Sequence, residues 1–323
     1  MSTRFDFVPL GETMIRLSPP NFERISQAKS LDIQIGGAES NVAVALARLG
    51  FRSAWLSRLP DNALGHRVTS DLNAHGVDTS GVRFAVHERM GTYFIELAVP
   101  PRPNRVIYDR AGSAASNMTI DDVDASAIGA TRWFHTTGIT PAISTNCLRM
   151  TADAVRMAKA AGATVSFDVN YRALLWPPKH AGESLEPILR HCDLVFVAHR
   201  DAISLFDAAP NANDAATQLR KRFGCSTLIV TLGEAGAIAQ TADTQLQVEQ
   251  SFKVPQIVDR IGAGDAFDAG FIAAQLLGKS LEESLVYGNA LSALKLTMPG
   301  DLALVGRDEL EALVGGAKSA SMR

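Results

Sequence analysis

The residues best suited to chemistry lie in one glycine-flanked turn. An extended run ends at Asp259, small residues follow, and a strongly apolar helix is expected to begin there. Gly262, Ala263 and Gly264 let the backbone approach a ligand closely, and the N–H groups at a helix N-terminus favour an anion. Asp265 stands beside them as a base able to accept a proton from an attacking hydroxyl. This segment fits phosphoryl transfer, which needs mainly positioning, charge stabilisation and one base.

A capping role is the competing interpretation of Asp265, because aspartate is a favoured N-cap residue. A second glycine-rich segment favours chemistry instead. Gly36 and Gly37 precede the first long helix and allow close approach of a substrate, and Asn41 can hydrogen-bond a hydroxyl. A plain strand-to-helix turn is the alternative for these three residues.

A third glycine-bearing segment closes a strand. Thr231 ends the expected strand, and Gly233 and Gly236 follow it at a place suited to nucleotide phosphates. Taken alone, the segment could equally be a hairpin turn. The three segments together favour phosphate chemistry over a simple helix cap.

Strands and helices alternate along most of the chain, which predicts a mostly parallel sheet covered by helices on both faces. A further β-rich patch is expected at 236–254. The expected strands are 5–10, 53–57, 133–137, 164–168, 194–197 and 227–231, and the expected helices are 38–49, 64–75, 143–161, 201–206, 215–223, 264–277, 281–297 and 307–313.

One region breaks this alternation. Three short β-rich runs, 82–87, 91–99 and 104–110, follow one another through polar and proline-rich connections, which indicates a meander. With the strand-like part of 12–35, they are expected to make a small sheet that projects from the main domain. The predicted domains are an α/β core of residues 1–11, 36–81 and 112–323 and a β lid of residues 12–35 and 82–111.

Composition narrows the class of protein. The chain has 323 residues, a net charge of −3 and 20% charged residues, without the basic footprint expected of a nucleic-acid-binding protein. No apolar run approaches the ~20 residues that span a bilayer, and Asp6 stands where a secretory signal would be apolar. Cys147, Cys192 and Cys225 form no paired framework. We expect a cytoplasmic enzyme with neither nucleic-acid nor membrane partners.

Two segments carry a family resemblance. Residues 36–50 and 259–265 resemble the signature regions of the PfkB, or ribokinase-like, carbohydrate kinases, and the similarity runs in matching order from the first strand to about residue 310. The resemblance implies a three-layer α/β/α sandwich with a mostly parallel sheet and a small β lid over the sugar site. It also implies ATP with Mg²⁺, and allows a monovalent cation. The resemblance implies Gly262, Ala263 and Gly264 as an anion hole and Asp265 as the base. The residues that it implies near the nucleotide are Thr231, Gly233, Gly236, Gly262, Gly264 and Asn289.

Several further segments resemble 2-keto-3-deoxygluconate kinases in particular, namely 11–19, 108–110, 168–172 and 298–301. Such a kinase converts 2-keto-3-deoxygluconate to 2-keto-3-deoxy-6-phosphogluconate. The substrate has a carboxylate, for which an arginine fork or a tyrosine hydroxyl is a natural partner. The candidate partners are Tyr93, Tyr108, Arg110 and Arg172.

Two positions depart from the family pattern. Arg260 stands where many members have threonine, and residues 198–201 replace the Asn-x-x-Glu motif associated with magnesium and phosphate. Asp201 keeps a carboxylate there and is the candidate metal ligand. His199 is a candidate for nucleotide binding, with an ordinary surface histidine as the alternative.

Three other functions compete with this one. The nearest is a fructokinase or ribokinase-like kinase of a neutral sugar, and a remote one is a non-catalytic sugar-acid sensor. A nicotinamide-dependent oxidoreductase is disfavoured because the first strand leads to Gly11-Glu12-Thr13 and not to a Gly-x-Gly-x-x-Gly turn. A homo-oligomer through the lid is also expected, since a small sheet with one apolar face is marginal alone.

Overall fold

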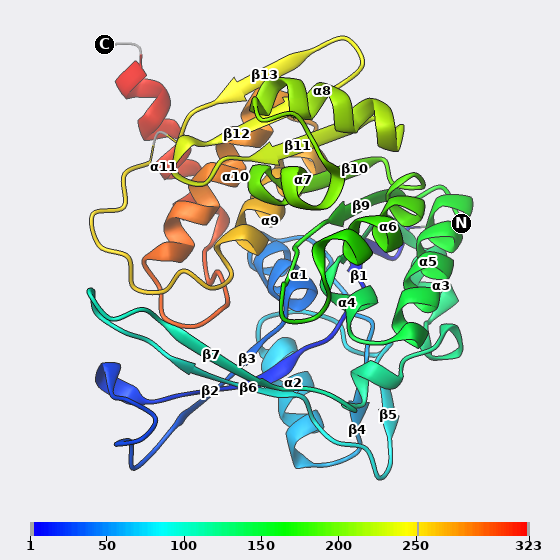
Figure 1. Cartoon of the computed structure of the whole chain (residues 1–323), viewed down its shortest axis with the longest axis vertical. Helices are drawn as coiled ribbons and strands as arrows, with labels where there is room; N and C mark the ends of the chain where they lie inside the picture. The colour runs from blue at the N-terminus through cyan, green and yellow to red at the C-terminus, as the bar shows by residue number, and fades with distance from the viewer. Residues whose placement is uncertain (1–2, 251, 322–323) are drawn as a thin grey trace.

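A seven-stranded sheet runs through the centre of the molecule (Figure 1). The computed structural model describes residues 3–250 and 252–321; the expected core also includes residues 1–2, 251 and 322–323, which lie outside the described residues. The first five strands in spatial order pair with one another in parallel, and each of the last two pairs antiparallel with the strand before it. In spatial order the strands are β1 (Phe5–Pro9), β8 (Thr131–Thr137), β9 (Thr164–Asp168), β10 (Leu194–Ala198), β11 (Thr227–Thr231), β12 (Ala237–Gln240) and β13 (Gln245–Val248).

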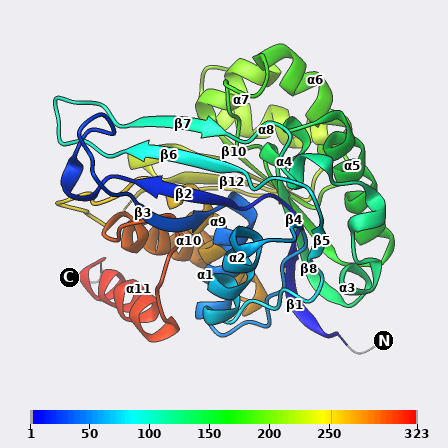
Figure 2. The same ribbon diagram turned by 90° about the horizontal axis from the view of Figure 1, so that it is seen from below.

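Helices cover both faces of this sheet, and each face has its own apolar cluster (Figure 2). This confirms the expected α/β/α layering. None of the helices within residues 3–250 and 252–321 combines the length and apolar character needed to cross a membrane. One face carries α3 (Ala125–Gly129), α5 (Thr145–Ala160), α6 (Pro178–Leu189), α7 (His199–Phe206) and α8 (Ala212–Phe223); the other carries α1 (Ala38–Arg48), α2 (Ala63–Ala74), α9 (Ala263–Leu276), α10 (Leu281–Leu296) and α11 (Arg307–Ser321).

A second, four-stranded sheet extends to one side of the core (Figures 1 and 2). Strand β2 pairs with β6 in parallel, and the outer pairs are antiparallel. Arg16, Tyr93 and Tyr108 stand opposite one another in the register, so their side chains share one face. The strands, in order, are β3 (Asp32–Gly36), β2 (Met14–Ser18), β6 (Thr92–Glu96) and β7 (Arg105–Asp109).

The predicted three-run meander is wrong in its first run. Strand β5 (Arg83–Ala85) pairs in parallel with β4 (Arg58–Pro60) as a separate two-stranded sheet. The composition of residues 82–87 predicted a strand but could not predict its partner. That partner depends on the path of the chain after α2, which brings β5 beside β4. There the backbone of Arg83 donates to the carbonyl of Ser57.

The predicted strand at residues 53–57 is present only as isolated bridges beside β1. Ala54 donates to the carbonyl of Phe7, and Leu56 donates to that of Pro9. A regular parallel ladder would need a return bond from the backbone N–H of residue 9. Proline has no N–H, so the ladder is interrupted at that position.

Candidate active site

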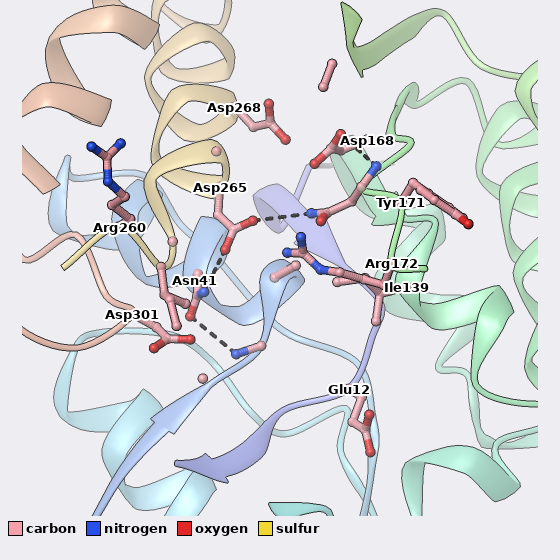
Figure 3. Close-up of a pocket in the computed structure, with 18 of the residues that line it drawn as sticks. Glu12, Asn41, Ile139, Asp168, Tyr171, Arg172, Arg260, Asp265, Asp268 and Asp301 are labelled. Atoms are coloured by element: carbon pink, nitrogen blue, oxygen red, sulfur yellow. Dashed lines mark hydrogen bonds between the residues drawn. The ribbon is translucent and has the colours of Figure 1, made fainter. Parts of the chain in front are cut away.

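A cavity of about 440 Å³ lies between the small sheet and the carboxyl ends of the central strands. Asp168, Ala198 and Thr231, which end or follow β9, β10 and β11, line it from the core. Tyr93 and Tyr108 line it from the small sheet. Ligands of open α/β sheets bind outside the carboxyl ends of the strands, so the cavity lies where this fold places a site. Figure 3 shows the side chains of Asn41 and Arg172 next to Asp265 of α9.

Asp265 sits in the first turn of α9, and its carboxylate does not cap the helix. The N-cap is Gly262, and no side chain caps this end. Instead, Asn41 donates to Oδ2 of Asp265 at 2.7 Å and Asn170 donates to Oδ1 at 3.5 Å (Figure 3). The capping interpretation is therefore wrong, because both oxygens are directed to residues of other elements at the cavity.

The electrostatic setting of Asp265 suits a proton acceptor. Burial raises the pKa of Asp265 to about 6, against the opposing effects of the Asn41 hydrogen bond and the Arg172 charge. The side chain of Arg172 makes no hydrogen bond or ion pair with any residue of the described ranges, and its guanidinium is turned toward Asp265 (Figure 3). A carboxylate with a pKa near 6 is ionised at neutral pH and is more basic than an exposed aspartate.

Two further buried carboxyl groups face each other beside Asp265. Asp168, at the end of β9, and Asp268, one turn along α9 from Asp265, both line the cavity. Burial and the neighbouring negative charges raise the pKa of both Asp168 and Asp268. Two carboxyl groups this close cannot both ionise at little cost, so the pair retains a proton. No role was predicted from the sequence for Asp168 or Asp268.

The turn before α9 is shaped by close packing. Gly262 has a φ of 81°, and a side chain there would collide with the backbone carbonyl of Asp301. A β-carbon at Gly264 would meet no atom within 4 Å, so this position opens on free space. Only glycine adopts such a conformation at Gly262 without strain, while Gly264 leaves room beside the N–H groups of the helix.

A second cavity, of about 690 Å³, lies on the other side of this turn. Thr231 and Gly264 line both cavities, so the two meet at the N-terminus of α9. Gly233, Gly236 and Asn289, which were predicted near the nucleotide, line the second cavity together with Ala263 of the predicted anion hole. Gly262, also predicted near the nucleotide, lines the first cavity. His199, the first residue of α7, lines neither cavity, although its neighbours Ala198, Arg200 and Asp201 line the first.

Two of the residues predicted to bind the substrate carboxylate from the small sheet already interact with acidic side chains of the protein. The hydroxyl of Tyr93 donates to Oδ2 of Asp301 at 2.7 Å, and Arg110 is paired with the buried carboxylate of Glu12. Tyr108 is 40% exposed and lies against the ring of Tyr93. Of the two predicted arginines, Arg172 is thus the one whose charge is not neutralised by a direct partner.

The paired glycines before α1 make room for the protein itself. A side chain at Gly36 would collide with Tyr93 and Asp301, and one at Gly37 would collide with the backbone of Glu12. Both glycines also line the first cavity, so the close approach of a substrate at this position stays a prediction.

Comparison with known proteins decides the family. Residues 5–305 match the family described as pfkB family carbohydrate kinase. The chain belongs to the PfkB family of carbohydrate kinases.

Two relatives of this kinase are named as kinases of 2-dehydro-3-deoxy sugars. It is 43% identical to a 2-dehydro-3-deoxygalactonokinase of Haloferax volcanii, over 96% of this chain and 97% of the relative. It is 30% identical to a 2-dehydro-3-deoxygluconokinase of Bacillus subtilis, over 98% and 97% of the two chains. Among solved structures, 2-dehydro-3-deoxygluconokinase of Thermotoga maritima superposes with a TM-score of 0.88 at 32% identity, covering 97% of this chain and all (100%) of that one.

The kinase also contains a buried ion network that sequence analysis missed. Arg16, on β2, is 1% exposed and donates at 2.6 Å to both Asp259 and Asp301. Asp259 also accepts from the backbone of Ile261 at 3.0 Å. The network thus ties the small sheet to the turn that precedes α9. The sequence offered one signal for this network, the charged Arg16 within a strand of alternating polarity. It could not show the partners of Arg16, which lie more than 240 residues away in the chain.

The candidate metal ligand Asp201 is available in this kinase. It is 7% exposed, lines the first cavity, and forms an ion pair with the exposed side chain of its neighbour Arg200. Burial raises the pKa of Asp201. Within the described ranges no three His, Cys, Asp or Glu side chains are arranged to hold a metal ion.

Proposed function

We propose that this kinase transfers the γ-phosphoryl group of ATP to 2-keto-3-deoxygluconate, giving 2-keto-3-deoxy-6-phosphogluconate and ADP. One observation carries the choice of a sugar acid over a neutral sugar: the guanidinium of Arg172 has no ion-pair partner within the described residues and faces Asp265 across the cavity. A carboxylate is the natural counter-ion for that position. The names of the relatives above support the same class of acceptor.

The chemistry follows from the arrangement at α9. Asp265 accepts the proton of the attacking hydroxyl, whose oxygen then forms a bond to the γ-phosphorus. The bond between that phosphorus and the β–γ bridging oxygen breaks, and ADP retains the electron pair. The backbone N–H groups at Gly262, Ala263 and Gly264 stabilise the charge on the transferred group, since a helix N-terminus carries about half a positive charge. Asn41 and Asn170 hold the base in place.

The nucleotide is proposed to occupy the second cavity, with its phosphates directed at Gly264. Thr231, Gly233, Gly236 and Asn289 line that side. Mg²⁺ bound to the phosphates would neutralise charge that develops during transfer, and Asp201, which lines the first cavity, is proposed as the carboxylate that would hold it. Residues 12–35 and 91–111 are proposed to act as a lid, because Met14, Tyr93 and Tyr108 close one side of the acceptor cavity.

Changing Arg172 to alanine is expected to raise the KM for 2-keto-3-deoxygluconate by about 10- to 100-fold, the value of one charge-assisted hydrogen bond. The KM for ATP should change by less than about twofold, because Arg172 lies outside the second cavity. Steady-state kinetics with Arg156→Ala, an exposed arginine on α5, as control would measure both.

Arg110 needs a separate experiment, since its removal leaves Glu12 buried without its cation. Arg110→Ala is therefore combined with Glu12→Gln, so that no unpaired charge remains. An unchanged KM for the keto acid in both the Arg172 variant and this double variant would contradict the sugar-acid assignment.

The rate should depend on pH through Asp265. Because burial raises the pKa of Asp265 to about 6, and the base must be ionised, kcat/KM is expected to rise with pH across this value and level off above it. Arg172 opposes that shift, so Arg172→Ala should move the midpoint to higher pH. A pH–rate profile of the two proteins measures this, and a profile that stays flat from about one unit below to about one unit above pH 6 would contradict the assignment of the base.

The small sheet is also proposed to join two copies of the chain. Ile33, Leu17, Phe94 and Ile107 lie in one row across its four strands, on the face opposite Tyr93 and Tyr108. Ile33 and Ile107 are 48% and 56% exposed. An exposed apolar row of this kind is typical of an interface between copies.

Changing both Ile33 and Ile107 to lysine is expected to weaken such a dimer at least about a hundredfold, because buried apolar anchors dominate an interface. Size-exclusion chromatography with light scattering would follow the dissociation, with Leu174→Lys, 81% exposed outside this sheet, as control. A wild-type protein that is monomeric at micromolar concentration would exclude the interface.

A further inference from the structure

Lys295 on α10 is fully buried, with 0% of its side chain exposed. Its ammonium group donates to the backbone carbonyl of Asp259 at 3.0 Å and lies 3.5 Å from that of Met298. A lysine is almost never buried to this extent unless its charge is matched. The function of this cation is not explained by the packing of α10 alone, since a methionine would fill the same space without the cost of burying charge.

The two carbonyls belong to the segments that support the anion-binding turn. Asp259 opens the turn that ends at Gly262, and Met298 opens the segment that ends at Asp301. These segments touch, because Gly262 packs directly on the carbonyl of Asp301. Lys295 therefore bridges the two chain segments on which the N-terminus of α9 rests.

The charges around Lys295 balance only when it is present. Its surroundings hold the carboxylates of Asp259 and Asp301 and one other cation, Arg16. Asp265, the proposed base, also contributes to the field at Lys295. Without the ammonium group, two buried carboxylates would face a single guanidinium, directly beneath a site that must bind phosphate.

We propose that Lys295 is a built-in cation that positions the anion-binding turn, in the place where a dissociable monovalent ion would otherwise bind. Backbone carbonyls from separate segments are the ligands that K⁺ takes in proteins, and an ammonium group offers three donors to the same oxygens. Phosphoryl transfer by this chain is therefore independent of K⁺ and NH₄⁺. The kinetic consequences of this inference rest on the proposed phosphoryl transfer. The contacts of Lys295 do not depend on which sugar is the acceptor.

The first test uses the unmodified protein. Turnover is compared in KCl and in tetramethylammonium chloride at equal ionic strength, because the larger ion cannot enter a site formed by carbonyl groups. The expected rates agree within about twofold. A loss of about tenfold or more on removal of K⁺ would overturn the proposal, since an external ion would then be required.

The second test removes the cation. Lys295→Ala is expected to lower kcat by about tenfold or more, with a smaller change in KM, and K⁺ or NH₄⁺ should recover part of the loss while tetramethylammonium should not. Lys221→Ala, an exposed lysine on α8, is the control and should respond to none of the salts. A loss of kcat that is the same in every salt would mean that Lys295 is only a packing residue.

Thermal unfolding gives a readout that does not depend on activity. Lys295→Ala and the bulkier Lys295→Met are prepared and refolded in each salt, and K⁺ or NH₄⁺ should raise the Tm of the alanine variant only, because methionine fills the void. Equal behaviour of the alanine variant in all salts, including failure to refold in all of them, contradicts the proposal. Absence of turnover by the unmodified protein on every sugar would overturn the proposed function, and this unfolding test would still decide the role of Lys295.

Discussion

Replacing Asp265 by asparagine is expected to lower kcat by about 10²- to 10⁴-fold while the acceptor still binds, because only the proton acceptor is removed. The amide has the same shape, but its NH2 group cannot accept a hydrogen bond, so one of the two contacts donated by Asn41 and Asn170 is lost. Coupled ADP release gives kcat, and equilibrium titration with the sugar acid gives the affinity.

Asp268→Asn is the matched control for that experiment. Asp268 lies one turn along α9, and burial with the charges of Asp168 and Asp265 raises its pKa well above the usual range. Because burial disfavours the charged form of Asp268, conversion to the neutral amide should reduce turnover far less than the same change at Asp265. Equal losses in the two variants, or full activity of Asp265→Asn, would contradict the role of Asp265. Unchanged function of Asp265→Asn would instead fit a sugar-acid sensor.

Replacing Arg16 by methionine is expected to reduce the free energy of unfolding by about 3–5 kcal/mol, the usual effect of leaving buried charges without their partner. Asp259 and Asp301 would both lose a hydrogen bond of 2.6 Å. Asp259 accepts a hydrogen bond from the backbone of Ile261 in the turn before α9. Because this turn is proposed to bind the transferred phosphoryl group, kcat should fall as well. Denaturant unfolding measures the first effect and steady-state kinetics the second.

Arg4→Met provides the comparison, because the Arg4–Asp78 pair lies at the surface with Arg4 57% exposed. Its loss should change the free energy of unfolding by about 1 kcal/mol or less. Adding Asp259→Asn and Asp301→Asn to Arg16→Met should restore part of the stability, since no buried charge would remain unpaired. A destabilisation by Arg16→Met no larger than that by Arg4→Met would contradict the buried network.

The alternation of strands and helices was predictable because its signals are local. Apolar runs indicate the elements, and glycines indicate where the helices end. Helix α6 (Pro178–Leu189) was not predicted, since Pro177, Pro178 and an internal Pro187 resemble a loop. Proline is nonetheless well placed in a first helical turn, and the buried face of α6 packs on α5 and α7. The bridges at residues 53–57 and the pairing of β5 likewise depended on distant backbone partners.

The candidate site was predictable where the chemistry is concentrated in one segment. Asp265 and its glycines stand together in the sequence, and Arg172 was recognisable through the segment that carries it. The roles of Asp168, Asp268 and Lys295 were not, because a buried charge and an exposed one look alike without the fold. The ammonium of Lys295 acts on a carbonyl 36 residues earlier in the chain, and Arg16 reaches Asp301 across 285 residues.

The most direct test of the proposed function is ATP turnover by coupled ADP release with Mg²⁺ present, measured against 2-keto-3-deoxygluconate, its galacto epimer, fructose and ribose. The sugar-acid site predicts strong preference for the two keto acids, with that preference lost in Arg172→Ala. Turnover with fructose or ribose alone would keep the kinase and contradict the assigned substrate. No turnover of any of the four by the folded protein would contradict the proposed function as a whole.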